Sequence, residues 1–324
     1  MRTPPFAALA LPGVAAALAC GGGGAAGGAR ASRPAPAATP AVPAARLVPR
    51  VAKVPGTDLR FLDGGAGLPV VFVHGSLATL DSWRPQFDAF ATGVRVVAYS
   101  RRYHPPNPAR PDGQAYALTL HADDLIGLIE ALRVERVHLV GSSYGAYVAL
   151  LVTLKRPDLV RSLVLEEPLL LPWLARSPEG DSLRRAFEAN VEEPARRAFA
   201  RGDSVEGVRR LLDGTSGRPG RYDALPETAR AELLRLAFEA RLELRADPDL
   251  YMPMLSCAQV GGIRHPVLLV VGERSPPLFH LLTEELARCL AAEEVVAVPG
   301  AGHEPHADNP AFYNAAVLRF LLKN

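Results

Sequence analysis

The chain has 324 residues, of which 48% are hydrophobic, so it can fill a large core as about two domains or as one domain with an insertion. Its formal net charge is only +2, from 36 basic and 34 acidic residues, which gives no electrostatic reason to expect a nucleic-acid partner. No apolar run of about 18 residues predicts a membrane-spanning helix, and no spacing of Cys and His predicts a metal site.

The first 20 residues have the composition of an export signal. One charge, Arg2, precedes an apolar run over 6–19, and the small-x-small sequence at 17–19 suits cleavage, so we predict a signal peptide at 1–20. Cys20 follows directly and resembles the lipidated cysteine of bacterial lipoproteins, which predicts a membrane tether through Cys20 at a bacterial cell envelope. The alternatives are a plain signal peptide and a cytoplasmic protein whose N-terminus has no role in export.

The next segment, 21–45, consists almost entirely of Gly, Ala and Pro. Such a composition offers little to bury and predicts a disordered linker. Only Cys257 and Cys289 remain in the folded part. Two cysteines without a framework spacing are weak evidence for a disulfide, and we expect two buried thiols.

From residue 46 onward, strand-like and helix-like segments alternate, which predicts an α/β sheet with mainly right-handed crossovers. Continuous apolar runs such as 68–75 are typical of strands buried on both faces of a parallel sheet. The expected strands are 47–54, 58–65, 68–75, 93–100, 135–143, 159–168, 265–274 and the segment from 293. Helical periodicity predicts helices at 119–134, 144–157 and 278–291.

The pattern changes between the strands at 159–168 and 265–274. Residues 169–264 read as amphipathic helices without a strand-like run, a segment far longer than an ordinary loop. We therefore expect a core formed by 46–168 and 265–324, with a helical cap inserted over one edge of the sheet.

The sequence Gly141-Ser142-Ser143-Tyr144-Gly145 stands between an expected strand and an expected helix. A G-x-S-x-G sequence in that context is a nucleophile elbow, which exposes the serine hydroxyl at the end of the sheet. The helix that follows directs its N-terminal amides toward negative charge developing nearby. Ser143 is therefore the predicted nucleophile.

A serine nucleophile needs a base and donors for an oxyanion. In enzymes that carry a nucleophile elbow, the base follows the serine and the acid in chain order. His303 follows the last expected strand, so His303 is the predicted base. The backbone N–H of Tyr144, directly after the nucleophile, is one predicted oxyanion donor. The backbone N–H of Ser76, after the strand at 68–75, is the other.

The segments FVHGS, GSSYG and PGAGHEPH, in this order, resemble the α/β-hydrolase superfamily over residues 46–324. The resemblance implies an eight-stranded, mostly parallel sheet with helices on both faces and a cap over the active site. It also implies hydrolysis through an acyl-enzyme, with no metal and no organic cofactor. The expected substrate is a small-molecule apolar ester, lactone or thioester, and Trp83 and Trp173 are candidates for the lining of its pocket. Nothing in the sequence sets the oligomeric state.

The sequence departs from the common family pattern at the triad acid. Most members carry Asp where this chain has Ser275, and serine cannot supply the negative charge that steadies an imidazolium. Glu167, at the end of the strand after the elbow, is the first candidate for a displaced acid. Glu273 is the second candidate and Glu166 the third. The structural alternative is that these glutamates are solvated charges at the rim.

Other functions fit the same motifs. An acyltransferase or a C–C bond hydrolase would use the same three residues and differ only in the pocket. Epoxide hydrolases and dehalogenases of this fold use an Asp nucleophile, and Ser143 argues against both. The absence of Asp at Ser275 also allows a non-catalytic ligand-binding protein on this fold.

Overall fold

The computed structural model describes residues 47–290, 292 and 294–324. The predicted signal peptide, Cys20 and the predicted linker at 21–45 lie outside the described residues. Within the described part of the chain, no helix combines the length and apolar character needed to span a membrane.

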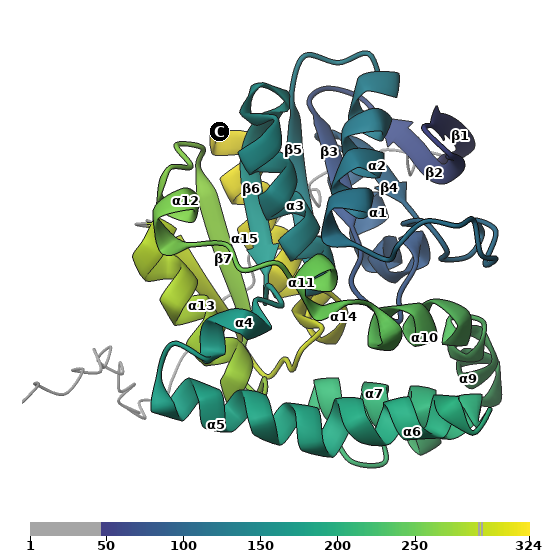
Figure 1. Cartoon of the computed structure of the whole chain (residues 1–324). Helices are drawn as coiled ribbons and strands as arrows, with labels where there is room; N and C mark the ends of the chain where they lie inside the picture. Colours follow the sequence, from purple (N-terminus) through teal and green to yellow (C-terminus); the bar gives the residue numbers. More distant parts are fainter. Residues whose placement is uncertain (1–46, 291, 293) are drawn as a thin grey trace, which may run out of the picture. The chain divides into compact units, whose positions relative to one another are not determined.

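Eight strands form one sheet in the order β1-β2-β4-β3-β5-β6-β7-β8 (Figure 1). β2 runs antiparallel to β1 and β4, and the other neighbouring strands pair in parallel. The strands are β1 (Val48–Val54), β2 (Thr57–Gly65), β3 (Pro69–Val73), β4 (Arg95–Tyr99), β5 (Val137–Ser142), β6 (Val160–Glu166), β7 (Val267–Gly272) and β8 (Glu294–Val298). The predicted fold class, an α/β-hydrolase sheet of eight mostly parallel strands, is confirmed.

The central strands are apolar because helices cover both faces of the sheet. Along β3, Val71 and Val73 face one core while Val70 and Phe72 face the other, as side-chain alternation in a strand requires. The first core is closed by α2 (Leu118–Ala131), α3 (Tyr144–Lys155) and α13 (Pro277–Leu290). The second is closed by α1 (Arg84–Ala91) and α15 (Pro310–Lys323).

The chain between β6 and β7 is helical and forms the segment called the cap below. Figure 1 shows its long helices in green across the end of the sheet. The cap helices are α4 (Leu171–Leu174), α5 (Pro178–Phe187), η3 (Glu188–Glu192), α6 (Glu193–Ala200), α7 (Ser204–Ser216), α8 (Arg221–Ala224), α9 (Glu227–Leu234), α10 (Ala237–Arg245), α11 (Pro248–Tyr251) and α12 (Cys257–Gly261). Ser177, Asp203 and Ser256 start α5, α7 and α12, because each side chain accepts a hydrogen bond from the N–H three residues later.

Cys257 and Cys289 form a disulfide, so the expectation of two buried thiols is wrong. α12 packs against α13 and brings the two Cα atoms to 5.2 Å, within the range that a disulfide requires. Both side chains are only half-buried, because they lie where the last cap helix meets the core. The two cysteines are 32 positions apart, and their spacing in the sequence does not indicate that they meet.

Candidate active site

The elbow that carries Ser143 is a strained turn between β5 and α3. Ser143 has φ 53° and ψ −119°, a conformation that a non-glycine residue adopts only when its surroundings enforce it. A Cβ at Gly145 would lie 2.2 Å from the carbonyl oxygen of Val73, and one at Gly141 would lie 2.6 Å from the carbonyl oxygen of Gly145. Both glycines of the motif are therefore required by the packing of the turn itself.

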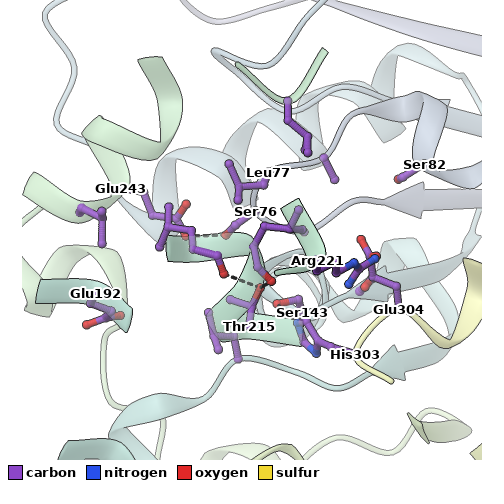
Figure 2. Close-up of a pocket in the computed structure, with 18 of the residues that line it drawn as sticks. Ser76, Leu77, Ser82, Ser143, Glu192, Thr215, Arg221, Glu243, His303 and Glu304 are labelled. Carbon is purple, nitrogen blue, oxygen red and sulfur yellow. Dashed lines mark hydrogen bonds and ion pairs between the residues drawn. The ribbon is translucent and has the colours of Figure 1, made fainter. Parts of the chain in front are cut away.

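The structure brings Ser143, His303 and Glu167 together from three strand ends. The hydroxyl oxygen of Ser143 is 3.2 Å from Nε2 of His303, and Nδ1 of His303 is 2.5 Å from Oε2 of Glu167. His303 follows β8, Glu167 follows β6, and the ring of Phe279 stacks on His303 with centroids 3.8 Å apart. Figure 2 shows Ser143 and His303 beside each other at the cavity. This is the nucleophile–base–acid order of a serine hydrolase.

Glu167 is held by Ser275, the position where the sequence resemblance led us to expect an Asp, and by the backbone of Gly272. Its side chain is fully buried, and its Oε1 accepts hydrogen bonds from the N–H of Gly272 at 2.6 Å and from the hydroxyl of Ser275. Its backbone has φ 43°, a second strained residue at the site. Ser275 therefore donates a hydrogen bond to the carboxylate of Glu167.

The two other candidate acids have different partners. Glu273 accepts a hydrogen bond from the N–H of Gly300 at 2.6 Å. Glu166 accepts from the hydroxyl of Ser142 at 2.7 Å and pairs with Nδ1 of His306 at 2.8 Å. Burial alone would lower the pKa of His306, but the charge and hydrogen bond of Glu166 raise it above its ordinary value.

A second Ser–Glu–His cluster thus lies beside the first, and sequence reasoning missed it. Ser142, Glu166 and His306 are all buried, and each stands close in sequence to its counterpart in the first cluster. Glu166 bridges the residue before the nucleophile to the segment that carries His303. The sequence signal for this second cluster is that each residue type occurs twice within a few positions, as in GSS, LEE and HEPH.

The loop after β3 contacts the elbow closely. A Cβ at Gly75 would lie 3.0 Å from Cβ of Ser143, so this loop passes directly over the nucleophile. The backbone N–H groups of Ser76 and Tyr144 make no hydrogen bond to another described residue. Both flank Ser143, where donors to an oxyanion must stand.

A cavity of about 290 Å³ opens at Ser143 between the core and the cap (Figure 2). Leu77 lines it from the core side, and Leu169, Phe187, Leu211 and Leu233 line it from the cap. These side chains suit an apolar substrate portion. Trp83 and Trp173, the sequence candidates for the lining, are instead buried away from the cavity.

Two carboxyl groups of the cap also reach this cavity, and neither was among the residues predicted for the site. Glu192, on the π-helical turn η3, and Glu243, on α10, both line it. Burial raises the pKa of Glu192 to about 7. Burial, and then the negative charge of Glu239, raise the pKa of Glu243 to about 7. The cavity is therefore less purely apolar than the sequence suggested.

Comparison with known proteins identifies the family of the chain. The model of the alpha/beta hydrolase family matches residues 70–316. An sn-1-specific diacylglycerol lipase ABHD11 from Mus musculus is 27% identical over 263 residues, 80% of this chain and 83% of its own length. Epoxide hydrolase A from Mycobacterium tuberculosis is 27% identical over 314 residues, 84% of this chain and 96% of its own. The chain therefore belongs to the α/β-hydrolase family.

Solved structures show the same fold. A structure titled "Est816 as an N-Acyl homoserine lactone degrading enzyme" is similar with a TM-score of 0.66 and 23% identity, covering 84% of this chain and 100% of that one. Naproxen esterase from Bacillus subtilis has a TM-score of 0.63 and 18% identity, covering 86% and 92%. At these identities the likeness concerns the fold, and the chemistry must be argued from the site.

Proposed function

We propose that the protein is a serine hydrolase that cleaves a carboxylic ester-type bond, an ester, lactone or thioester, through an acyl-enzyme. The observation that carries this proposal is the continuous chain from the Ser143 hydroxyl through His303 to the buried Glu167. A hydroxyl nucleophile paired with an imidazole is suited to attack on a carbonyl carbon.

In the proposed mechanism, the Ser143 oxygen attacks the substrate carbonyl while Nε2 of His303 takes the hydroxyl proton. Glu167 accepts the hydrogen bond from Nδ1 and stabilises the imidazolium that forms. The backbone N–H groups of Ser76 and Tyr144 donate to the oxyanion. His303 then protonates the leaving group, and afterwards activates a water molecule that hydrolyses the acyl-enzyme.

The walls of the cavity support a small or medium substrate with an apolar portion, and the carboxyl groups of Glu192 and Glu243 add polar contacts. The similarity to a diacylglycerol lipase and to a lactone-degrading enzyme is consistent with an acyl substrate. An acyltransferase or a C–C bond hydrolase would use the same three residues. The intact hydrogen-bond chain argues against a non-catalytic binding protein.

We further propose that the chain is exported, with Cys20 as its lipidated anchor. The Cys257–Cys289 disulfide supports this location, because disulfides persist in oxidising compartments. Mass spectrometry of the N-terminal fragment of protein from a bacterial envelope tests the proposal. A lipidated Cys20 supports it, and an unmodified, uncleaved Met1 contradicts it.

The mechanism is tested by hydrolysis of p-nitrophenyl acetate and by labelling with a fluorophosphonate, which reacts with activated serines. We expect Ser143→Ala to abolish both, and Glu167→Gln to lower kcat by orders of magnitude. Glu273→Gln is the matched control, because Glu273 bonds to Gly300 and not to His303. If Glu273→Gln fell and Glu167→Gln did not, the acid would be misassigned. A wild type inert to both reagents would favour the binding-protein alternative.

A further inference from the structure

Glu243 joins the cap to the loop that flanks the nucleophile. It lies on α10, lines the cavity and is only 7% exposed. Its Oε1 accepts a hydrogen bond from the Ser76 hydroxyl, with the two oxygens 2.5 Å apart, and a second from the hydroxyl of Tyr251. Figure 2 shows the contact between Glu243 and Ser76. Ser76 makes no other side-chain hydrogen bond to a described residue.

The peptide unit before Ser76 is held by contacts with Arg101. The buried guanidinium of Arg101 donates to the carbonyl oxygen of Gly75 at 3.1 Å and to that of His74 at 3.1 Å. Because C=O and N–H of a trans peptide point in opposite directions, holding the Gly75 oxygen turns the Ser76 N–H away from Arg101. The next residue, Leu77, has φ 50°, so the loop holds a strained conformation that needs such support.

We propose that Glu243 is a positioning residue for the oxyanion hole, and that this cap carboxyl fixes Ser76 so that its backbone N–H faces the substrate carbonyl oxygen. The oxyanion hole is then assembled jointly by the core, through Arg101 and Gly75, and by the cap, through Glu243. This inference rests on the acyl-enzyme mechanism proposed above.

The charge of Glu243 affects how well it can position Ser76 beside an oxyanion. An ionised carboxylate beside a developing oxyanion would oppose it, whereas a neutral carboxyl keeps Oε1 as an acceptor for both hydroxyls. The charged and titratable groups around it are Glu239, Arg101, Tyr116, Tyr144, Tyr251 and Glu192. With a pKa of about 7, Glu243 is neutral below that pH and ionises above it. We therefore expect the protonated form to be the working one, and kcat to fall as the carboxyl ionises at higher pH.

The test measures kcat and KM of the full chain with p-nitrophenyl acetate from about pH 5.5 to 9. Glu243→Leu is expected to lower kcat roughly tenfold to a hundredfold with KM within about threefold, as loss of an oriented oxyanion donor does. Ser76→Ala keeps the backbone N–H but removes the hydroxyl that Glu243 holds. The kcat of the double variant should be no lower than that of the less active single variant, because both changes remove the same hydrogen bond between Ser76 and Glu243.

Two further variants separate positioning from general damage. Glu243→Gln, a permanently neutral isostere, should recover much of the activity lost in Glu243→Leu and should lack the fall in kcat above about pH 7. Glu227→Leu, at an exposed cap position that does not line the cavity, is the matched control. Thermal melting of each variant identifies any that fail to fold.

The outcomes are distinguishable. If the losses of Glu243→Leu and Ser76→Ala multiply in the double variant, or if Glu243→Gln is as impaired as Glu243→Leu, the positioning role is refuted. A wild-type pH profile in Glu243→Gln would refute only the part assigned to the ionisation of Glu243. If Ser143→Ala is inactive in the same assay, the proposed mechanism survives that refutation. If Ser143→Ala is as active as wild type, the mechanism itself fails, whatever the Glu243 variants do.

Discussion

Replacing Glu243 by Gln should make the protein more stable at alkaline pH, relative to wild type. The carboxyl group has an ordinary pKa of 4.5 and a pKa of about 7 in the folded chain. A pKa raised by folding adds stability below 4.5, and that stability is lost as the pH rises toward 7. At 1.36 kcal/mol per pH unit, the gap between the two values corresponds to about 3 kcal/mol. Gln cannot ionise, so the variant escapes this loss.

The assay is urea unfolding followed by circular dichroism at about pH 4.5 and about pH 8.5, with the disulfide intact in both proteins. The free energy of unfolding of the variant, minus that of wild type, should increase by about 3 kcal/mol between the two pH values. Glu227→Gln, whose carboxyl is exposed, should show no such increase. An identical pH dependence of wild type and Glu243→Gln would mean that Glu243 ionises like an exposed carboxyl, which would refute the reasoning.

Three other predictions follow from contacts at the site and the cap. Ser275→Ala removes one of two donors to Oε1 of Glu167. Loss of a hydrogen bond to a charged group should lower kcat/KM for p-nitrophenyl acetate about tenfold, and a change below about twofold would contradict this. Gly145→Ala places a Cβ 2.2 Å from a carbonyl oxygen of β3, so its thermal midpoint should fall by many degrees, and a midpoint equal to wild type would show that the turn can relax. Cys257→Ser opens the loop closed with Cys289 and should cost about 3 kcal/mol of unfolding free energy in urea, with no further effect of reductant; reductant that left wild type unchanged would refute it.

The sheet could be predicted because its strands are local apolar runs. Segments such as 68–75 are buried on both faces, and a buried parallel strand needs no polar alternation to be recognised. Ser143 could be placed by the glycines around it, since the turn leaves no room for other residues. The proposal of Glu167 as the acid rests on a local observation too, the Ser at 275 in a strand-end turn.

Contacts between residues far apart in the chain could not be predicted from the sequence. Ser76 and Glu243 are 167 positions apart, and the periodicity of a helix does not show which distant core group a buried glutamate will meet. The disulfide was missed for the same reason, because it depends on how α12 packs on α13. The support that Ser275 gives to Glu167 required knowing that the two strand ends are neighbours in the sheet.

The helix α10 carries two buried carboxyl groups one turn apart, and each is matched to a different part of the core. Glu239 lies 2.9 Å from Nε2 of His104 and accepts a hydrogen bond from the hydroxyl of Tyr116, while Glu243 accepts one from the hydroxyl of Ser76. The cap therefore contacts this core through specific buried polar groups, and exchanging the cap alone would remove those contacts. A cap without carboxyl groups at these two positions would leave these core groups buried without partners, so engineering of substrate range should move the helix and its core partners together.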